Sequence, residues 1–190
     1  MSTKQKQATL VLVRGLPGSG KSTIIAHVAK LLQSGSFIVL DPDKTDHSSS
    51  EYLAHIEQQK SEGVDEKLWP YRFLRAQSAT AISQAKVVLW NQAFTNLDAF
   101  RQIISRHQEI AAQSGVALRV LVVEVSIDPE LARRRIAERV KQGEHDVADD
   151  RFENFVRDYR SFADLGFEMV LLEGTDDPDK NAEKIVDALY

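Results

Sequence analysis

The chain of 190 residues contains no cysteine, so disulfide frameworks, thiolate zinc sites and cysteine nucleophiles are all excluded. It also lacks a long hydrophobic run, because the apolar stretch at residues 10–13 is too short for a signal-peptide core or a membrane span. These absences favour a cytoplasmic protein that does not associate with a membrane. The five histidines show no metal-ligand spacing, which argues against a zinc site.

An excess of basic residues is also missing, because the formal net charge is −4. Tight binding to long nucleic-acid duplexes through many phosphate contacts is therefore disfavoured, although a local basic groove stays open. The chain does contain 43% hydrophobic residues, which is enough to bury a core without disulfides or metals. We expect one domain over residues 1–190 that begins with a polar tail, residues 1–7.

Short apolar runs alternate along the chain with segments of helical periodicity. The predicted strands are residues 9–14, 37–40, 86–90, 117–125 and 167–172. Helices are expected at 21–33 and 98–113 and after Asp128-Pro129 and Asp177-Pro178, and a helical insert is expected at about 48–84. This alternation predicts an α/β three-layer sandwich with a mainly parallel five-stranded sheet.

Residues 15–22 read Gly-Leu-Pro-Gly-Ser-Gly-Lys-Ser and match the P-loop pattern GxxxxGK[ST] without a mismatch. The segment lies between a predicted strand and a predicted helix, so its glycines and the helix N-terminus can direct backbone N–H groups at phosphates. We expect Lys21 to hold the β- and γ-phosphates of ATP and Ser22 to ligate Mg²⁺. The expected ATP-binding residues are Gly15, Pro17, Gly18, Ser19, Gly20, Lys21, Ser22 and Thr23.

Two carboxylates, Asp41 and Asp43, follow the second predicted strand. They lie where ligands bind in open α/β sheets, and a carboxylate there can accept a proton from a substrate hydroxyl. Asp-Pro-Asp is also an ordinary turn composition, so residue type alone leaves catalysis and a structural turn both open.

Residues 14–23, together with Leu-Asp-Pro-Asp at 40–43, resemble the zeta-toxin and polynucleotide-kinase group of P-loop kinases. Residues 135–147 are similar to the lid of the zeta family, in which an arginine-bearing helix runs into a Gly-Gly-His-x-Val-Pro stretch. The resemblance implies a general base after the second strand, with Asp43 the better match and Asp41 the second. It also implies a lid at about 133–151 whose arginines, Arg135 and Arg139, contact ATP phosphates.

Arg135 and Arg139 are one helical turn apart, so both can point at one anionic ligand, although a solvated basic helix face is the alternative. In the family the third strand ends in an aspartate that supports Mg²⁺, whereas this chain has Asn91. Metal binding is then expected to depend on Ser22, the ATP phosphates and Asp41. Asn91 either contacts a metal-bound water or the substrate, or simply ends a strand.

Two groups of aromatic residues are interpreted as packing residues. Phe152, Phe155, Tyr159 and Phe162 have the i, i+3, i+7, i+10 spacing of one buried helix face. Trp69, Tyr71 and Phe73 are expected to pack a helix onto its neighbour rather than to form a nucleobase platform.

The leading functional prediction is ATP-dependent transfer of the γ-phosphate to a hydroxyl of a small molecule or nucleotide sugar. Lys21, Arg135 and Arg139 would stabilise charge, and Asp43 would handle the proton. A related alternative is phosphorylation of 5′-hydroxyl ends of nucleic acid, which the negative net charge disfavours. A third is an ATP-binding switch that signals to a protein partner. The missing carboxylate at Asn91 permits this switch, but the arginines and aspartates argue against it. The phosphoacceptor and any antitoxin or other protein partner stay open.

Overall fold

The computed structural model describes residues 6–142 and 147–190, and its five strands form one parallel sheet in the order β2-β3-β1-β4-β5. The strands are β1 (Gln7–Arg14), β2 (Phe37–Leu40), β3 (Val87–Asn91), β4 (Ala117–Ser126) and β5 (Met169–Glu173). The predicted α/β sandwich with a parallel five-stranded sheet is confirmed.

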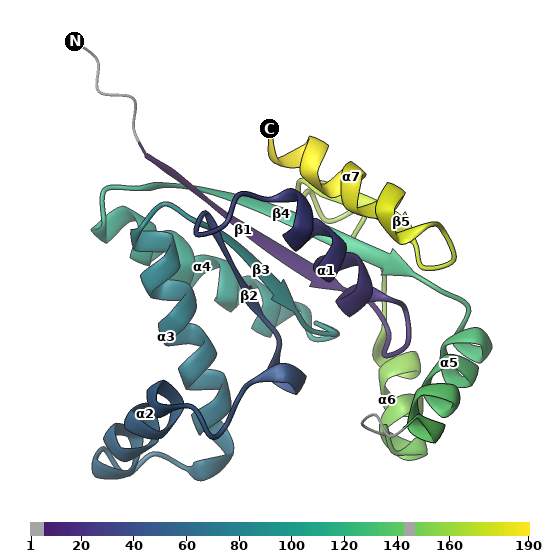
Figure 1. The fold of residues 1–190 in the computed structure, drawn as a ribbon, viewed down its shortest axis with the longest axis horizontal. Coiled ribbons are helices and arrows are strands. Elements are labelled where there is room, and N and C mark those ends of the chain that lie inside the picture. The colour runs from purple at the N-terminus through teal and green to yellow at the C-terminus, as the bar shows by residue number, and fades with distance from the viewer. Residues whose placement is uncertain (1–5, 143–146) are drawn as a thin grey trace.

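Helices cover both faces of this sheet (Figure 1). One face carries α1 (Lys21–Leu31) and α7 (Pro178–Leu189), and the other carries α3 (Trp69–Ser83) and α4 (Leu97–Gln113). Between β2 and α3 lie η1 (Pro42–Lys44), α2 (Ser50–Ser61) and η2 (Glu66–Leu68), and β4 is followed by α5 (Pro129–Lys141) and α6 (Asp149–Asp158). Figure 1 shows two arms, α2 with the adjoining part of α3 and α5 with α6, that project from the same side of the sheet. None of the helices in the described part of the chain has the length and apolar character that a membrane span requires.

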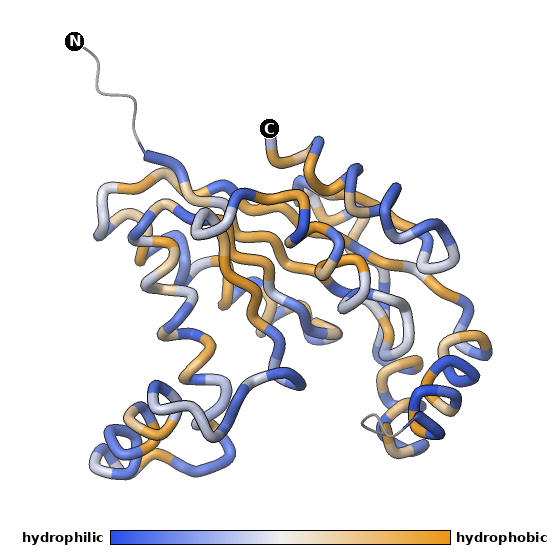
Figure 2. The backbone as a smooth tube through the Cα atoms, viewed as in Figure 1, coloured by the Kyte–Doolittle hydropathy of each residue, from blue (hydrophilic) through white to orange (hydrophobic). Residues whose placement is uncertain are grey.

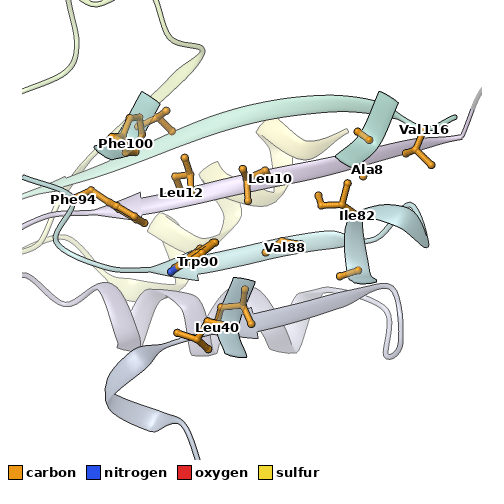
Figure 3. Packing of buried hydrophobic residues seen from close by; sticks show 14 of the residues in the cluster. Ala8, Leu10, Leu12, Leu40, Ile82, Val88, Trp90, Phe94, Phe100 and Val116 are labelled. Carbon is orange, nitrogen blue, oxygen red and sulfur yellow. The ribbon is translucent and has the colours of Figure 1, made fainter. Parts of the chain in front are cut away.

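The central strand β1 supplies both cores of the sandwich. Leu10 and Leu12 pack with α3 and α4, whereas Val11 and Val13 pack with α1 and α7, and all four side chains are fully buried. A parallel sheet that is covered on both faces needs apolar residues at successive positions, which is why the sequence shows a continuous run here. Figure 2 shows the strands as the apolar centre, with hydrophilic residues on the outer helices. Figure 3 shows the α3–α4 side of the core around Leu10, Leu12, Leu40, Trp90, Phe94 and Phe100.

The prediction of one buried helix face from Phe152 to Phe162 is wrong. The helix α6 ends at Asp158, and Tyr159 already has extended backbone. Phe152 packs in a small core within the α5–α6 arm, whereas Phe162 belongs to the main core of the sheet. The spacing rule fails because it assumes that the helix continues through all four aromatic positions.

A buried polar contact joins α3 to α4 behind the main core. His107 Nδ1 lies 2.7 Å from the Ile103 carbonyl oxygen, and His107 Nε2 lies 2.7 Å from the Ser78 hydroxyl. Because Nδ1–H donates to the carbonyl, the Nε2 atom of the neutral ring is an acceptor, and it shares the single Ser78 hydroxyl proton with the Arg75 carbonyl oxygen, which lies 2.8 Å from that hydroxyl. Burial lowers the pKa of His107, and the nearby guanidinium groups of Arg75 and Arg106 lower it further.

We expect the free energy of unfolding to fall as the pH is lowered from 7 to 5. The unfolded chain takes up a proton on His107 near its ordinary pKa of about 6.5, whereas the folded protein takes it up only at lower pH. Urea denaturation at several pH values measures this slope. In His107→Gln the slope is expected to be smaller, and an equal slope in the variant would contradict the assignment.

Candidate active site

The connection between β1 and α1 is a tightly packed loop in which two positions admit only glycine. Gly15 and Gly18 have φ values of +148° and +82°. A Cβ at Gly15 would lie 2.5 Å from the Val125 carbonyl oxygen, and one at Gly18 would lie 2.6 Å from the Ala132 carbonyl oxygen. The loop is therefore held between the end of β4 and the first turn of α5. The first N–H groups of α1 lack intrahelical acceptors and are suited to binding an anion.

The side chain of Lys21 folds back over this loop. Its ammonium nitrogen Nζ donates to the carbonyl oxygens of Gly15 and Leu16, both at 2.9 Å. These acceptors hold the ammonium group beside the loop amides, where phosphate oxygens would be bound.

The charge of Lys21 is destabilised by its surroundings. Burial lowers the pKa of Lys21 from 10.5 to about 8. The carboxylates of Asp41 and Asp43 oppose this shift, whereas the guanidinium group of Arg139 adds to it. The structure thus places four of the predicted residues, from the loop, from the end of β2 and from α5, within electrostatic reach of one another.

The carboxyl ends of β2 and β3 meet the start of α1 through the side chain of Asn91. Its nitrogen Nδ2 donates to Ser22 Oγ at 2.9 Å and to Asp41 Oδ2 at 2.7 Å. Asp41 is 7% exposed, and its second oxygen, Oδ1, accepts the backbone N–H of Asp43 at 3.1 Å. Because a carboxylate can only accept, Asp41 requires the amide nitrogen of Asn91 to face it. The structure therefore joins a hydroxyl, an amide and a carboxylate that the sequence left as separate candidates.

These residues fit a magnesium ion that is bound mostly by nucleotide and water oxygens. In residues 6–142 and 147–190, no group of three or more His, Cys, Asp and Glu side chains could hold a metal by itself. Mg²⁺ commonly takes one or two protein oxygens together with phosphate oxygens, and Ser22 and Asp41 supply that set. Asn91 Oδ1 is buried and has no hydrogen-bond partner among the described residues, so one further acceptor is present.

A cavity of about 850 Å³ opens over these side chains. Its walls come from the phosphate loop, η1, the β3–α4 connection and the α5–α6 arm. Predicted site residues that line it are Pro17, Gly18, Lys21, Ser22, Thr23, Asp41, Asp43 and Arg139. Asp41 is buried, whereas Asp43 is exposed to the cavity. Ser19 is fully buried, and its backbone N–H donates to the Leu16 carbonyl oxygen at 3.1 Å, so this predicted ATP-binding residue does not face the cavity.

The two arginines of α5 are directed to different places. Arg139 lines the cavity, whereas Arg135 Nη1 donates to the Gly174 carbonyl oxygen at 2.9 Å. Arg135 also lies beside the phosphate loop, since a Cβ at Gly20 would lie 4.0 Å from Arg135 Nη1, so contact of both arginines with ATP phosphates stays a prediction. The turn after β5 packs against the phosphate loop, since a Cβ at Gly174 would lie 2.3 Å from the Ser19 carbonyl oxygen, and Arg135 binds the carbonyl of this turn. Residues 143–146 of the lid-like block lie outside the described residues.

Residues 10–162 match the AAA domain family. The chain belongs to this family. A search of curated proteins found no significant match.

Solved structures share the fold of this AAA domain protein. A gluconokinase from Sinorhizobium meliloti 1021 has a TM-score of 0.57 at 15% identity, and the match covers 98% of this chain and 93% of the gluconokinase. A fungal RNA kinase has a TM-score of 0.62 at 14% identity, and the match covers 98% of this chain and 86% of the RNA kinase. A structure from the PezAT toxin–antitoxin system of Streptococcus pneumoniae has a TM-score of 0.61 at 16% identity, and the match covers 92% of this chain and 71% of that protein. At these identities the similarity establishes a P-loop kinase fold and not a substrate.

Several residues around the cavity of this AAA domain protein were not predicted from the sequence. Tyr71, expected to pack between helices, is 40% exposed and lines the cavity. Unpredicted lining residues also include Gln92, Phe94, Asn96, Arg151 and Phe155. Gln92, Phe94 and Asn96 lie between β3 and α4, where side chains carry no periodic signal. Tyr71, Arg151 and Phe155 lie on α3 and α6, and their helical spacing does not reveal the cavity that they face.

The sequence did contain an unused signal at Arg14 and Glu124. Each is a charged residue that adjoins the apolar run of its strand, and both are buried, at 0% and 5% exposed. They face each other in the β1–β4 ladder and form an ion pair. Charged residues are rarely buried without a partner, so two such positions at corresponding strand ends indicate a pair.

A second cavity of about 580 Å³ lies between α2, α3 and the edge strand β2. Its lining includes Ile38, Leu40, His55, Phe73 and Gln77. None of the predicted site residues lines this cavity, so it is separate from the arrangement around Lys21.

Proposed function

We propose that this protein is an ATP-dependent phosphotransferase that moves the γ-phosphate to a hydroxyl of a small molecule or nucleotide sugar, as in the zeta-toxin and polynucleotide-kinase group. The observation that carries the proposal is the bridge from Ser22 through Asn91 to Asp41, beside Lys21 and open to a large cavity. Carboxylates from a neighbouring strand serve phosphate transfer in two ways, because metal binding and proton transfer both use such groups. A nucleotide-dependent switch needs only the first, and the second carboxylate, Asp43, which faces the same cavity, favours transfer.

Each residue has a part in this proposal. The loop amides and Lys21 bind the β- and γ-phosphates, and Arg139 adds positive charge from the other wall of the cavity. Ser22 and Asp41 would hold Mg²⁺, and Asn91 Nδ2 positions both side chains by donating a hydrogen bond to each. When bound, Mg²⁺ neutralises negative charge on the phosphate oxygens.

Asp43 is the proposed general base. It is the carboxylate exposed to the cavity, whereas Asp41 is buried and occupied by Asn91 and by a backbone N–H. The acceptor hydroxyl oxygen forms a bond to the γ-phosphorus, the bond from that phosphorus to the β-phosphate oxygen breaks, and ADP leaves. The hydroxyl proton passes to the Asp43 carboxylate.

A screen of hydroxyl acceptors with γ-labelled ATP tests the proposed function. Sugars, nucleosides, nucleotide sugars and a 5′-hydroxyl oligonucleotide form the arms of the screen. We expect label on one of the small molecules. Label on the oligonucleotide alone would identify an end kinase, and ATP binding without any labelled acceptor would overturn the kinase proposal in favour of a switch.

We expect Asp43→Asn to lower the turnover of the labelled acceptor by about 10²-fold to 10⁴-fold, because the amide cannot take the proton. ATP affinity, measured by calorimetry, should stay near that of the wild type. Asp46→Asn is the matched control, since Asp46 is exposed, bonds to Ser48 and does not line the cavity. Full transfer by the Asp43 variant would show that another group accepts the proton.

A further inference from the structure

Arg14, the last residue of β1, is fully buried immediately before the phosphate loop. Its guanidinium group pairs with the Glu124 carboxylate and donates to the carbonyl oxygens of Phe94 at 3.3 Å and Arg160 at 2.8 Å. A guanidinium group is suited to this task because its five N–H donors form a rigid fork. One side chain thus binds β4, the β3–α4 connection and the segment that follows α6.

Aromatic rings enclose the same guanidinium group. The carbon atom Cζ of Arg14 lies 3.5 Å from the ring centroid of Phe162 and 4.4 Å from that of Tyr159. The Tyr159 hydroxyl is buried and has no hydrogen-bond partner among the described residues, and burial raises the pKa of Tyr159 to about 12. Tyr159 therefore contributes its neutral ring to the contact, and its hydroxyl takes no part in it.

The Arg14–Glu124 pair holds both ends of the α5–α6 arm. The arm leaves the sheet just after Glu124, near the end of β4, and returns at residues 159–162. The N–H of Phe162 donates to Glu124 Oε2 at 3.0 Å, and the Arg160 carbonyl accepts from Arg14. Figure 1 shows this returning segment running from α6 back to the sheet.

Within the arm, packing is separate from the main cores. Ala132, Ile136 and Phe152 form a small core of their own with Val147 and neighbouring side chains. A unit with its own core keeps its internal structure when it shifts, so its position depends on how it is attached. Arg139 lies on this arm and faces the cavity, so the attachment determines where Arg139 is placed.

The pair also reaches the cavity wall through Phe94. Phe94 lines the cavity and has a φ of +50°, a left-handed conformation that is costly for a residue other than glycine. The carbonyl oxygen of Phe94 is a hydrogen-bond acceptor of Arg14, which stabilises that conformation.

We propose that Arg14 is a positioning residue that fixes the α5–α6 arm and the Phe94 wall relative to the phosphate loop through Glu124. The anchoring itself stands on the contacts above, and its effect on transfer rests on the proposed function. The competing explanation is that the pair only stabilises the fold. Buried ion pairs can often be replaced by apolar residues of similar volume without loss of stability, which allows the two explanations to be separated.

The test is the double variant Arg14→Met with Glu124→Leu, which removes both charges and keeps apolar volume. We expect a folded variant with moderately lower thermal stability, because no charge is left buried alone but the Phe162 N–H and the carbonyl oxygens of Phe94 and Arg160 lose their partners. Amide hydrogen exchange over α6 and residues 159–162 should become roughly tenfold faster, while exchange in β1 and β4 stays unchanged. Turnover should fall by about 10²-fold through misplacement of the arm, with ATP affinity largely kept.

Tyr159→Phe is the matched control, because it removes only the unpartnered hydroxyl and keeps the ring on Arg14. We expect wild-type exchange and turnover from it. Unchanged exchange in a stable double variant would overturn the proposal. The exchange measurement needs neither ATP nor an acceptor, so it decides the anchoring even if no transfer is found in the wild type. If the double variant does not fold, Arg14→Lys, which keeps the charge but loses the fork, is examined by the same exchange measurement with the same criterion.

Discussion

Lys21→Met is expected to reduce phosphate transfer by about 10³-fold, because the variant loses the ammonium group that binds the β- and γ-phosphates. The same change is expected to raise the stability of the ligand-free protein at pH 7. Burial makes the charged form of Lys21 unfavourable in the fold, and methionine fills similar space without a charge. Loss of function with a gain of stability is typical of a group that is kept for binding.

The stability gain has a defined pH dependence. The pKa of Lys21 is about 8 in the fold and near 10.5 when the chain is unfolded. Between these values the unfolded wild type binds more protons than the folded protein, so wild-type stability rises with pH through this window. The advantage of Lys21→Met is therefore fully present below pH 8 and is lost as the pH approaches the unfolded value.

Denaturant unfolding at pH 7 and at pH 10, together with ATP titrations, measures both effects. Lys180→Met, a substitution at an exposed position on α7, is the control and should change neither. An Lys21 variant that still binds ATP as tightly as the wild type would contradict the position given to the phosphates.

Asp41→Asn is expected to lower transfer by about 10²-fold to 10³-fold, and to remove most of the effect of Mg²⁺ on ATP affinity. The variant has an amide at position 41 facing the amide of Asn91, where the wild type has a carboxylate and an amide 2.7 Å apart. Without the carboxylate of Asp41 next to Ser22, the phosphate oxygens of the nucleotide are the charged ligands that remain for the metal.

The swap variant, in which Asp41→Asn is combined with Asn91→Asp, tests more sharply whether the metal position needs a carboxylate. It keeps one carboxylate and one amide between the same two strands, but moves the charge to β3. We expect the swap variant to be about tenfold more active than Asp41→Asn, since either arrangement places a carboxylate beside the magnesium position. Asn91→Asp alone should be impaired, because two carboxylates at this distance repel each other.

Calorimetric titration of ATP with and without Mg²⁺ provides the readout, and it does not depend on turnover. If Asp41→Asn binds ATP with an unchanged response to Mg²⁺, the metal assignment is wrong. If the swap variant transfers phosphate no faster than Asp41→Asn, the position of the carboxylate matters more than its presence.

Local chemistry made much of the fold predictable. The apolar residues of β1 indicated a strand covered on both faces, and both faces are covered. Helices were predicted to begin at Asp128-Pro129 and Asp177-Pro178, and the two aspartate side chains cap them by accepting the backbone N–H groups of Leu131 and Asp179. Such interactions involve neighbours in the chain, so residue order is sufficient to identify them.

Contacts across long stretches of chain were harder to predict. The bridge from Asn91 to Asp41 joins residues 50 positions apart, and the pair of Arg14 and Glu124 joins residues 110 positions apart. Sequence patterns identified Asp41 and Asn91 as candidates but left their roles open, and the Arg14–Glu124 pair was not identified. Arg135 is a further example, since its helical spacing from Arg139 did not reveal its hydrogen bond to the Gly174 carbonyl oxygen, which lies 39 residues away in the chain.

The sequence by itself determined that the chain forms an α/β sandwich and where its phosphate loop lies, because strand burial and loop conformation follow from residues that are adjacent in the chain. Only the tertiary structure decided which carboxylate is buried against Asn91, which arginine faces the cavity, and that Arg14 holds both ends of the α5–α6 arm. The reason is that strand order and register bring distant side chains together, and the sequence does not specify strand order residue by residue.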